Sequence, residues 1–158
     1  MRNTDEVAVL LHNIRSAHNV GSIFRTADAA GVSKIYLSGY SPTPIDRFGR
    51  KSNEIGKTAL GGELSIEWEH LKSPHDSIAT LKNNEWQIVG VEQDTRAIDY
   101  RSFKISKPTL FIFGNEVQGI SKALRDACDT LVEIPMHGKK ESLNVSVAAG
   151  IVLFSLAQ

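Results

Sequence analysis

Two segments in the last third of the chain combine strand-like apolar stretches with glycine, asparagine, glutamate and serine, residue types that commonly contact ligands. They read FIFGNEVQGIS over residues 111–121 and IPMHGKKESLNVSVAAG over residues 134–150. In open α/β sheets, ligands bind in the crevice beyond the carboxyl ends of the strands. We therefore predict a ligand site at strand ends, to which a third segment, HNVGSIFRTADAAG at residues 18–31, also contributes.

The segment 111–121 does not match two common nucleotide-binding motifs. Gly114 and Gly119 have the spacing of a phosphate-binding loop, but Ile120 stands where that loop requires lysine, so the phosphates lose their main charge partner. No Gly-x-Gly-x-x-Gly fingerprint follows a predicted strand, which disfavours a dinucleotide enzyme of the Rossmann type. From its residues alone, the segment is a turn in which Glu116 is a solvated acid.

The segment 134–150 ends a strand and begins a helix. Asn144 is a good N-cap, and the apolar residues after it predict a buried face made of Val145, Val147, Ala148, Ile151 and Val152. Gly150 within this helix costs about 1 kcal/mol relative to alanine. Its presence therefore predicts that another backbone packs closely against it.

The segment 18–31 predicts a helix of about three turns, with Asn19 as N-cap and Gly31 as C-cap. Its apolar residues have helical spacing and form one stripe of Val20, Ile23, Phe24, Ala27 and Ala30. Arg25 lies roughly opposite that stripe, which is also the position of an ordinary exposed arginine. Because the helix follows the first strand, its first turns lie at the sheet edge where the other two segments end.

Together the three segments resemble the motifs of the SpoU/TrmH family, RNA ribose 2′-O-methyltransferases of the SPOUT superfamily, and the resemblance spans most of the chain. It implies that Arg25 is the catalytic arginine, with Asn19, Glu116, Ser142 and Asn144 orienting groups around it. It also implies S-adenosylmethionine as cofactor, with glycine letting backbone groups approach adenine and ribose closely. The implied cofactor-binding residues are Phe113, Gly114, Asn115, Glu116, Gly119, Ile134, Met136, Ser142, Leu143 and Asn144.

The resemblance further implies a deep trefoil knot at the C-terminus and a homodimer formed through the closing helix. General rules of chain connection argue against a knot, so this expectation comes from the resemblance alone. Phe154 and Ser155 stand where relatives often have tyrosine and glutamate, a departure at the expected dimer contact.

The size and composition of the chain predict one SPOUT-type domain over residues 1–158, without a separate RNA-binding extension. The only cysteine, Cys128, has no partner for an internal disulfide, and the five histidines lack the paired spacing of metal ligands. We therefore expect no metal. No apolar run has the length of a membrane span, so we expect a soluble protein of the reducing cytoplasm.

The formal net charge of zero gives no support for nucleic-acid binding, so any RNA contact must come from a local patch. Residues 1–60 are mildly basic, with eight Lys and Arg against five Asp and Glu. The candidate RNA-binding residues are Arg47, Arg50, Lys51, Lys57, Lys139 and Lys140, although a solvated charged loop explains the first four equally well.

Apolar runs predict strands at residues 7–11, 34–38, 65–68, 86–91, 109–113 and 130–134, and helices at 20–31, 74–84, 121–128 and 144–156, with a loop at 39–51. This alternation predicts an α/β fold with a mostly parallel sheet flanked by helices. The function expected is methyl transfer from S-adenosylmethionine to a ribose 2′-hydroxyl of structured RNA, with transfer RNA favoured. Ribosomal RNA as substrate and a catalytically inactive RNA-binding module remain alternatives.

Overall fold

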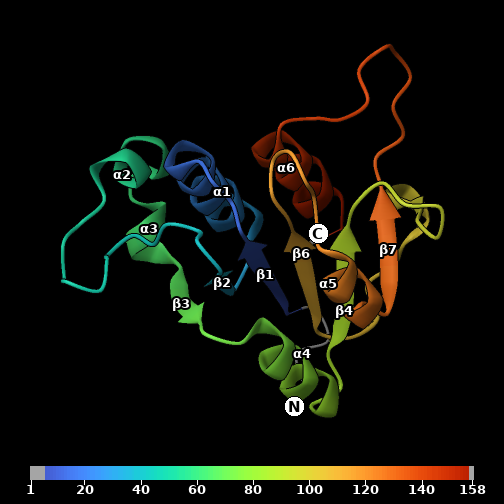
Figure 1. Ribbon diagram of the computed structural model, residues 1–158, viewed down its shortest axis with the longest axis horizontal. Helices are drawn as coiled ribbons and strands as arrows, with labels where there is room; N and C mark the ends of the chain where they lie inside the picture. Colours follow the sequence, from blue (N-terminus) through green and yellow to red (C-terminus); the bar gives the residue numbers. More distant parts are fainter. Residues whose placement is uncertain (1–5, 157–158) are drawn as a thin grey trace.

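A computed structural model describes residues 6–156, which contain one sheet of seven parallel strands (Figure 1). The strand order across the sheet is β3-β2-β1-β6-β4-β7-β5. The strands are β1 (Val7–His12), β2 (Lys34–Ser38), β3 (Glu67–Leu71), β4 (Gln87–Val91), β5 (Ile98–Asp99), β6 (Thr109–Phe113) and β7 (Thr130–Glu133).

Helices cover both faces of the sheet, as expected for parallel strands. The helices are α1 (Ala17–Ala30), α2 (Asn53–Ala59), α3 (Gly62–Ser65), α4 (Pro74–Asn83), α5 (Lys122–Ala127), α6 (Val145–Leu156) and the short 3₁₀ helix η1 (Tyr100–Ser102). One face packs against α1, α2 and α6, and the opposite face packs against α4 and α5.

The central strands β1 and β6 are buried on both faces of the sheet, which explains their largely apolar sequences. In β1, Val9 and Leu11 face the core on the α1 side, whereas Ala8 and Leu10 face the core on the α4 side. Successive side chains of a strand point to opposite faces, so a strand covered on both sides is apolar at nearly every position. β6 shows the same alternation and is buried along its whole length.

The predicted α/β fold with a parallel sheet is confirmed, and β2 and β6 have the predicted bounds. The predicted strand at residues 65–68 is displaced, because Ser65 belongs to α3 and the strand begins at Glu67. The sequence interpretation missed α2, α3, β5 and η1. These elements have at most seven residues each, too few to establish a hydrophobic period.

Asn19 is not the N-cap of α1. The helix begins at Ala17, three residues before the predicted start, and the hydroxyl of Ser16 caps it by accepting a 3.1 Å hydrogen bond from the backbone N–H of Asn19. The predicted C-cap is confirmed, since Gly31 has the left-handed φ of 82° typical of that position.

The buried face of α6 also differs from the prediction. Val145, Ala149, Val152 and Leu153 are buried, whereas Val147 is 49% exposed. The predicted set mixed residues from two sides of a helix that is apolar over most of its circumference, so periodicity gave no unique answer. No helix within residues 6–156 is long and apolar enough to cross a membrane.

Candidate functional site

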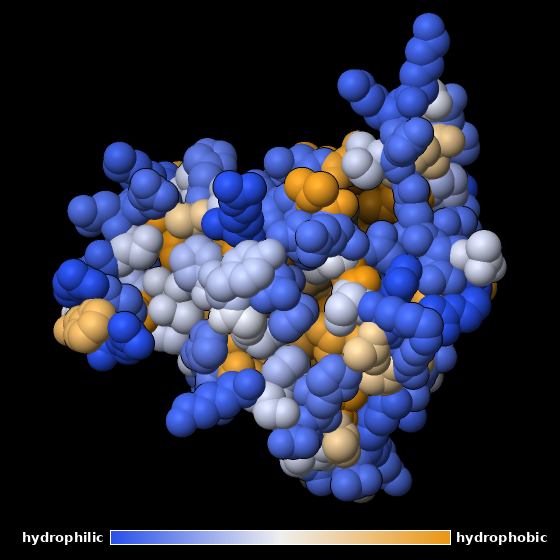
Figure 2. Space-filling view, viewed as in Figure 1, coloured by the Kyte–Doolittle hydropathy of each residue, from blue (hydrophilic) through white to orange (hydrophobic). Residues whose placement is uncertain are grey.

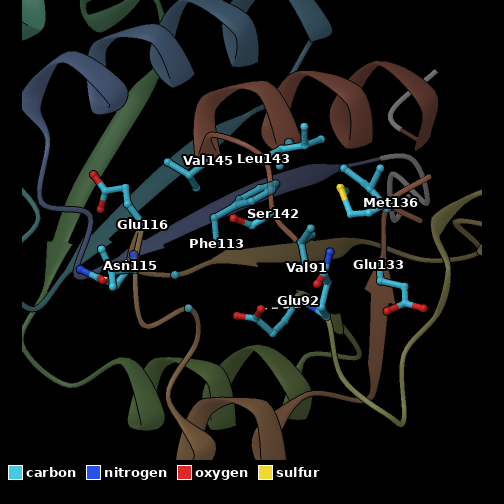
Figure 3. A pocket seen from close by; sticks show the side chains of 16 residues that line it. Val91, Glu92, Phe113, Asn115, Glu116, Glu133, Met136, Ser142, Leu143 and Val145 are labelled. Atoms are coloured by element: carbon cyan, nitrogen blue, oxygen red, sulfur yellow. Dashed lines mark hydrogen bonds between the residues drawn. The ribbon is translucent and has the colours of Figure 1, made fainter. Parts of the chain in front are cut away.

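A cavity of about 150 Å³ lies beyond the carboxyl ends of β4, β6 and β7, where the start of α6 closes one side (Figure 3). The chain between β7 and α6 leaves the body of the molecule in a long exposed loop before it returns to the cavity (Figure 1). The lining residues are Val91, Glu92, Gln93, Phe113, Gly114, Asn115, Glu116, Val117, Gly119, Glu133, Ile134, Met136, Ser142, Leu143, Val145 and Ala148.

All but one of the residues predicted to bind a cofactor line this cavity. The exception, Asn144, caps α6 instead. Its side-chain oxygen accepts hydrogen bonds from the backbone N–H and the hydroxyl of Ser146, at 2.9 and 2.6 Å. Asn144 therefore acts at the first turn of α6, as its residue type predicted, and holds the end of the loop that bears Ser142 and Leu143.

The loop after β6 is a tight turn held by Asn115. The side-chain oxygen of Asn115 accepts the backbone N–H groups of Val117 and Gln118, both at 2.9 Å. Its side-chain nitrogen donates to the carbonyl of Asn13 at 3.0 Å and to the hydroxyl of Tyr40 at 2.9 Å. One side chain thus shapes the turn and ties it to the ends of β1 and β2.

Gly114 is required by the turn itself. A Cβ atom on Gly114 would lie 2.4 Å from the carbonyl carbon of Gly119 and 2.5 Å from the amide nitrogen of Ile120. Real Cβ atoms do not approach backbone so closely, so any side chain here would open the turn. Closure of the loop is thus one reason for a glycine at this position, and Gly114 also lines the cavity.

Glu92, which the sequence interpretation missed, stabilises the same turn through hydrogen bonds from the end of β4. Its carboxylate accepts the backbone N–H of Ile120 at 2.7 Å and that of Gln93 at 3.1 Å. A Cβ on Gly119 would lie 2.1 Å from a carboxylate oxygen of Glu92, and Gly119 has a positive φ of 71°. The sequence could have indicated Glu92 as a site residue, because it directly follows a predicted strand and ligand sites lie at the carboxyl ends of strands.

Glu116 is not a solvated loop acid. One carboxylate oxygen accepts the backbone N–H of Arg15 at 2.8 Å, and the other accepts the backbone N–H of Ser16 at 2.9 Å and the side-chain amide of Asn19 at 3.1 Å. Partial burial tends to raise the pKa of this carboxyl, but the hydrogen bonds outweigh burial and hold the pKa below its usual value. Glu116 therefore joins the loop after β6 to the start of α1.

No residue of the segment 18–31 lines the cavity, to which the sequence predicted that it contributes; the segment is connected to the lining through Asn19 and not through Arg25. Asn19 is only 8% exposed and bonds to Glu116. Arg25 lies on the exposed side of α1, as its helical position predicted. It lines a separate shallow groove that also contains Lys57 of α2 and Phe154 of α6, and it is absent from the lining of the cavity.

The candidate RNA-binding residues fall into three places. Arg47, Arg50 and Lys51 line a groove beside β3, whereas Lys57 lies in the groove that contains Arg25. Lys139 and Lys140 are exposed in the loop between β7 and α6. Of the four basic residues that the sequence suggested as one patch, the structure thus groups three in one groove and places Lys57 in another.

The comparison with known proteins agrees with this arrangement. A sequence profile described as the SpoU rRNA Methylase family matches residues 6–154. The tRNA (guanosine(18)-2′-O)-methyltransferase of Aquifex aeolicus is 33% identical over 149 residues, which are 94% of this chain and 67% of that protein.

Solved structures of two methyltransferases superpose closely on the chain. The SpoU methyltransferase AviRb of Streptomyces viridochromogenes, in complex with AdoMet, has a TM-score of 0.86 at 28% identity and covers 97% of this chain. The AdoMet-bound rRNA methyltransferase of Sinorhizobium meliloti has a TM-score of 0.84 at 32% identity and covers 95%. The chain spans only 60% and 55% of the lengths of these two proteins.

The profile match covers nearly all described residues, and the two segments that line most of the cavity are those that carried the family resemblance in the sequence. The chain belongs to the SpoU rRNA methylase family.

Proposed function

We propose that this chain transfers a methyl group from S-adenosylmethionine to a ribose 2′-hydroxyl of a structured RNA, with transfer RNA favoured over ribosomal RNA. The observation that carries the proposal is the cavity itself. The loop after β6 and the loop before α6, which α5 and β7 separate in the chain, line one space at the carboxyl edge of the sheet. The Aquifex relative is named for this chemistry on transfer RNA, and two structural relatives were solved with AdoMet.

The cavity suits this cofactor chemically. Phe113, Ile134 and Leu143 provide apolar surface for an adenine ring. The lining also includes the carboxylates of Glu92 and Glu133 but no lysine or arginine, so the local field favours a cationic ligand. When bound, S-adenosylmethionine supplies an electrophilic methyl group on a positively charged sulfonium.

Within this proposal, Asn19, Glu116 and Asn144 are positioning residues. Both oxygens of Glu116 are already engaged by donors at the start of α1, and Asn144 is engaged by the first turn of α6. We therefore do not assign proton acceptance to Glu116 or to Asn144. Asn19 and Glu116 hold the loop after β6 against the start of α1, and Asn144 holds the loop that carries Ser142 and Leu143 against α6. Correct placement of the ribose 2′-hydroxyl supplies much of the catalysis of such a transfer.

Arg25 remains the proposed catalytic residue, acting across a homodimer interface. It stands beside Phe154, which is 47% exposed, and α6 also exposes Val147. Because these exposed apolar side chains lie on a helix next to Arg25, we propose that a second copy of the chain packs against them. A guanidinium holds its proton to beyond about pH 12, so we assign Arg25 to stabilising the developing alkoxide or a neighbouring phosphate rather than to accepting the proton.

Two further features belong to the proposal through family membership. We propose that the loop before α6 and α6 itself pass through another loop as a trefoil knot. We also propose a cytoplasmic location, where structured RNA substrates are available.

The test is binding and turnover with the purified chain. Calorimetry should detect S-adenosylmethionine at micromolar affinity, and labelled methyl groups should enter ribose 2′ positions of tRNA isolated from cells that lack the gene. Incorporation into ribosomal RNA alone would support the alternative substrate. RNA binding without cofactor binding would identify an inactive module, and preference for a dinucleotide would overturn the proposal altogether.

A further inference from the structure

A second groove, of about 940 Å³, lies between the loop of residues 39–52 and the carboxyl end of β3. In Figure 1 this loop extends from the body of the molecule on the side of α2, away from the loop before α6. The groove is unusual in its aromatic lining, which consists of Tyr40, Phe48, Trp68 and His70.

The loop is a preorganised turn rather than a loose connection. The carboxylate of Asp46 accepts the backbone N–H groups of Phe48 and Arg50, at 2.8 and 3.0 Å, and the guanidinium Nε of Arg50 at 2.8 Å. Ile45 and Lys51 pair across the base of the turn as an antiparallel bridge. Hydrogen bonds from the Arg50 backbone and side chain hold the pKa of Asp46 below its usual value, so the turn keeps this anchor at neutral pH.

This turn presents Phe48 to solvent together with positive charge. Phe48 is 66% exposed and belongs to neither hydrophobic core. The guanidinium carbons of Arg47 and Arg50 lie 4.8 and 5.0 Å from its ring centroid. Figure 2 shows an apolar group bordered by strongly hydrophilic side chains where this loop forms the edge of the molecule. Such a side chain contributes little to folding and is free to contact a ligand.

The groove is connected to the candidate active site through Tyr40. Tyr40 is 59% exposed and lines both this groove and a neighbouring one that contains Arg15, Ser16 and Asn115. Its hydroxyl accepts the side-chain N–H of Asn115, a residue that also lines the cavity beyond β6. The surface from the cavity to Phe48 is therefore continuous along the carboxyl edge of the sheet.

We infer that this groove binds an unpaired nucleotide of the RNA substrate, with its base stacked on Phe48 and its flanking phosphates against Arg47 and Lys51. The inference rests on the proposed function, because it concerns the same RNA. Sequence-tolerant recognition of unpaired RNA combines an exposed aromatic platform with neighbouring cations. Asp46 already compensates much of the charge of Arg50, so Arg47 and Lys51 supply most of the charge complementarity to phosphate.

The test uses a stem–loop RNA with 2-aminopurine in its unpaired loop and a fully paired duplex of the same strand length. Binding is measured with S-adenosylhomocysteine present, so that no turnover is needed. Phe48→Ala should weaken stem–loop binding about tenfold and relieve the quenching of 2-aminopurine fluorescence. Phe48→Trp keeps an aromatic ring and should bind the stem–loop and quench the fluorescence as the wild type does. Leu64→Ala is the matched control, because Leu64 is 82% exposed on α3 and lies outside the groove lining.

The outcomes separate this inference from the proposed function. If the wild type methylates RNA but Phe48→Ala binds the stem–loop like the wild type, the groove inference is wrong and the function stands. If no RNA is methylated but the Phe48 effects appear, the groove inference stands and the function fails. Failure of the wild type to bind the stem–loop, or an equal loss with the duplex, overturns the inference. So does an effect of Phe48→Ala confined to association with another protein.

Discussion

The side-chain amide of Asn19 donates a 3.1 Å hydrogen bond to Glu116, which lies 97 residues further along the chain. This contact, together with the two backbone N–H groups that Glu116 accepts, fixes the start of α1 against the loop that lines the cavity. Two segments of the family motif are therefore coupled mechanically before any ligand binds. The coupling makes Glu116 a residue whose replacement has consequences for both stability and site geometry.

We expect Glu116→Gln to lower the free energy of unfolding at pH 7 by about 1–2 kcal/mol, because an amide cannot satisfy the three N–H donors as a carboxylate does. The folded pKa lies below the usual 4.5. The stabilisation is therefore present above about pH 4.5 and is lost as the pH falls through the folded pKa. Urea unfolding of both proteins across this range should show the difference shrink on acidification, and Glu141→Gln, at an exposed loop position, should show none. A pH-independent difference would contradict the assignment.

Gly114→Ala should open the turn after β6, because its Cβ would meet the backbone of Gly119 and Ile120. We expect a loss on the order of 2 kcal/mol in stability, typical of overpacking, together with loss of S-adenosylmethionine binding. Calorimetry and chemical denaturation measure the two effects. Gly138→Ala is the control, since nothing lies within 4 Å of its Cβ position. Unaltered cofactor affinity in Gly114→Ala would show that the turn after β6 is not needed for cofactor binding.

Arg25→Ala should reduce methyl transfer by about 100-fold or more while S-adenosylmethionine still binds, if the guanidinium stabilises charge in the transition state. Arg25 is absent from the cavity lining, so mixed dimers decide how it acts. A dimer of one Arg25→Ala subunit and one Leu143→Arg subunit contains an intact cavity facing an intact arginine only if Arg25 works across the interface. Activity in the mixed dimer, with neither parent active, is the expected result. An inactive mixture would place the arginine in its own subunit.

Gly150→Ala tests what covers α6. Within residues 6–156, no other backbone lies within 4 Å of its Cβ position, which would meet the Thr26 side chain at an ordinary 3.7 Å. The close backbone that the sequence predicts at Gly150 therefore has to come from a second copy of the chain, if it exists. In an isolated subunit, alanine should therefore stabilise the helix by about 1 kcal/mol. If a second copy packs there, the same change should weaken dimerisation, as sedimentation over a range of concentrations would detect.

Gly56→Ala is the matched control for that experiment. Its Cβ would lie 3.6 Å from Glu63, and it sits in α2. This change should stabilise the subunit to a similar degree without altering association. Equal sedimentation of both variants and the wild type as monomers would remove the homodimer from the proposal.

The sequence by itself determined the central sheet and most of the cavity. Thr109–Phe113 is buried on both faces, so its position in the fold left a continuous apolar signature that could be interpreted locally. The loops at 113–119 and 134–143 could be assigned to one site because the ends of parallel strands meet at one edge. Both inferences need only local pattern and one general rule of topology.

Only the tertiary structure decided which groups those loops bring into contact. The hydrogen bonds of Glu116 to the start of α1, the support of Gly119 by Glu92, and the separation of Arg25 from the cavity depend on contacts between residues distant in sequence. Local propensity carries no information about such pairs. The groove of Tyr40 and Phe48 likewise exists because a turn held by Asp46 folds over the end of β3, and nothing in the composition of that loop distinguished it from a solvated one.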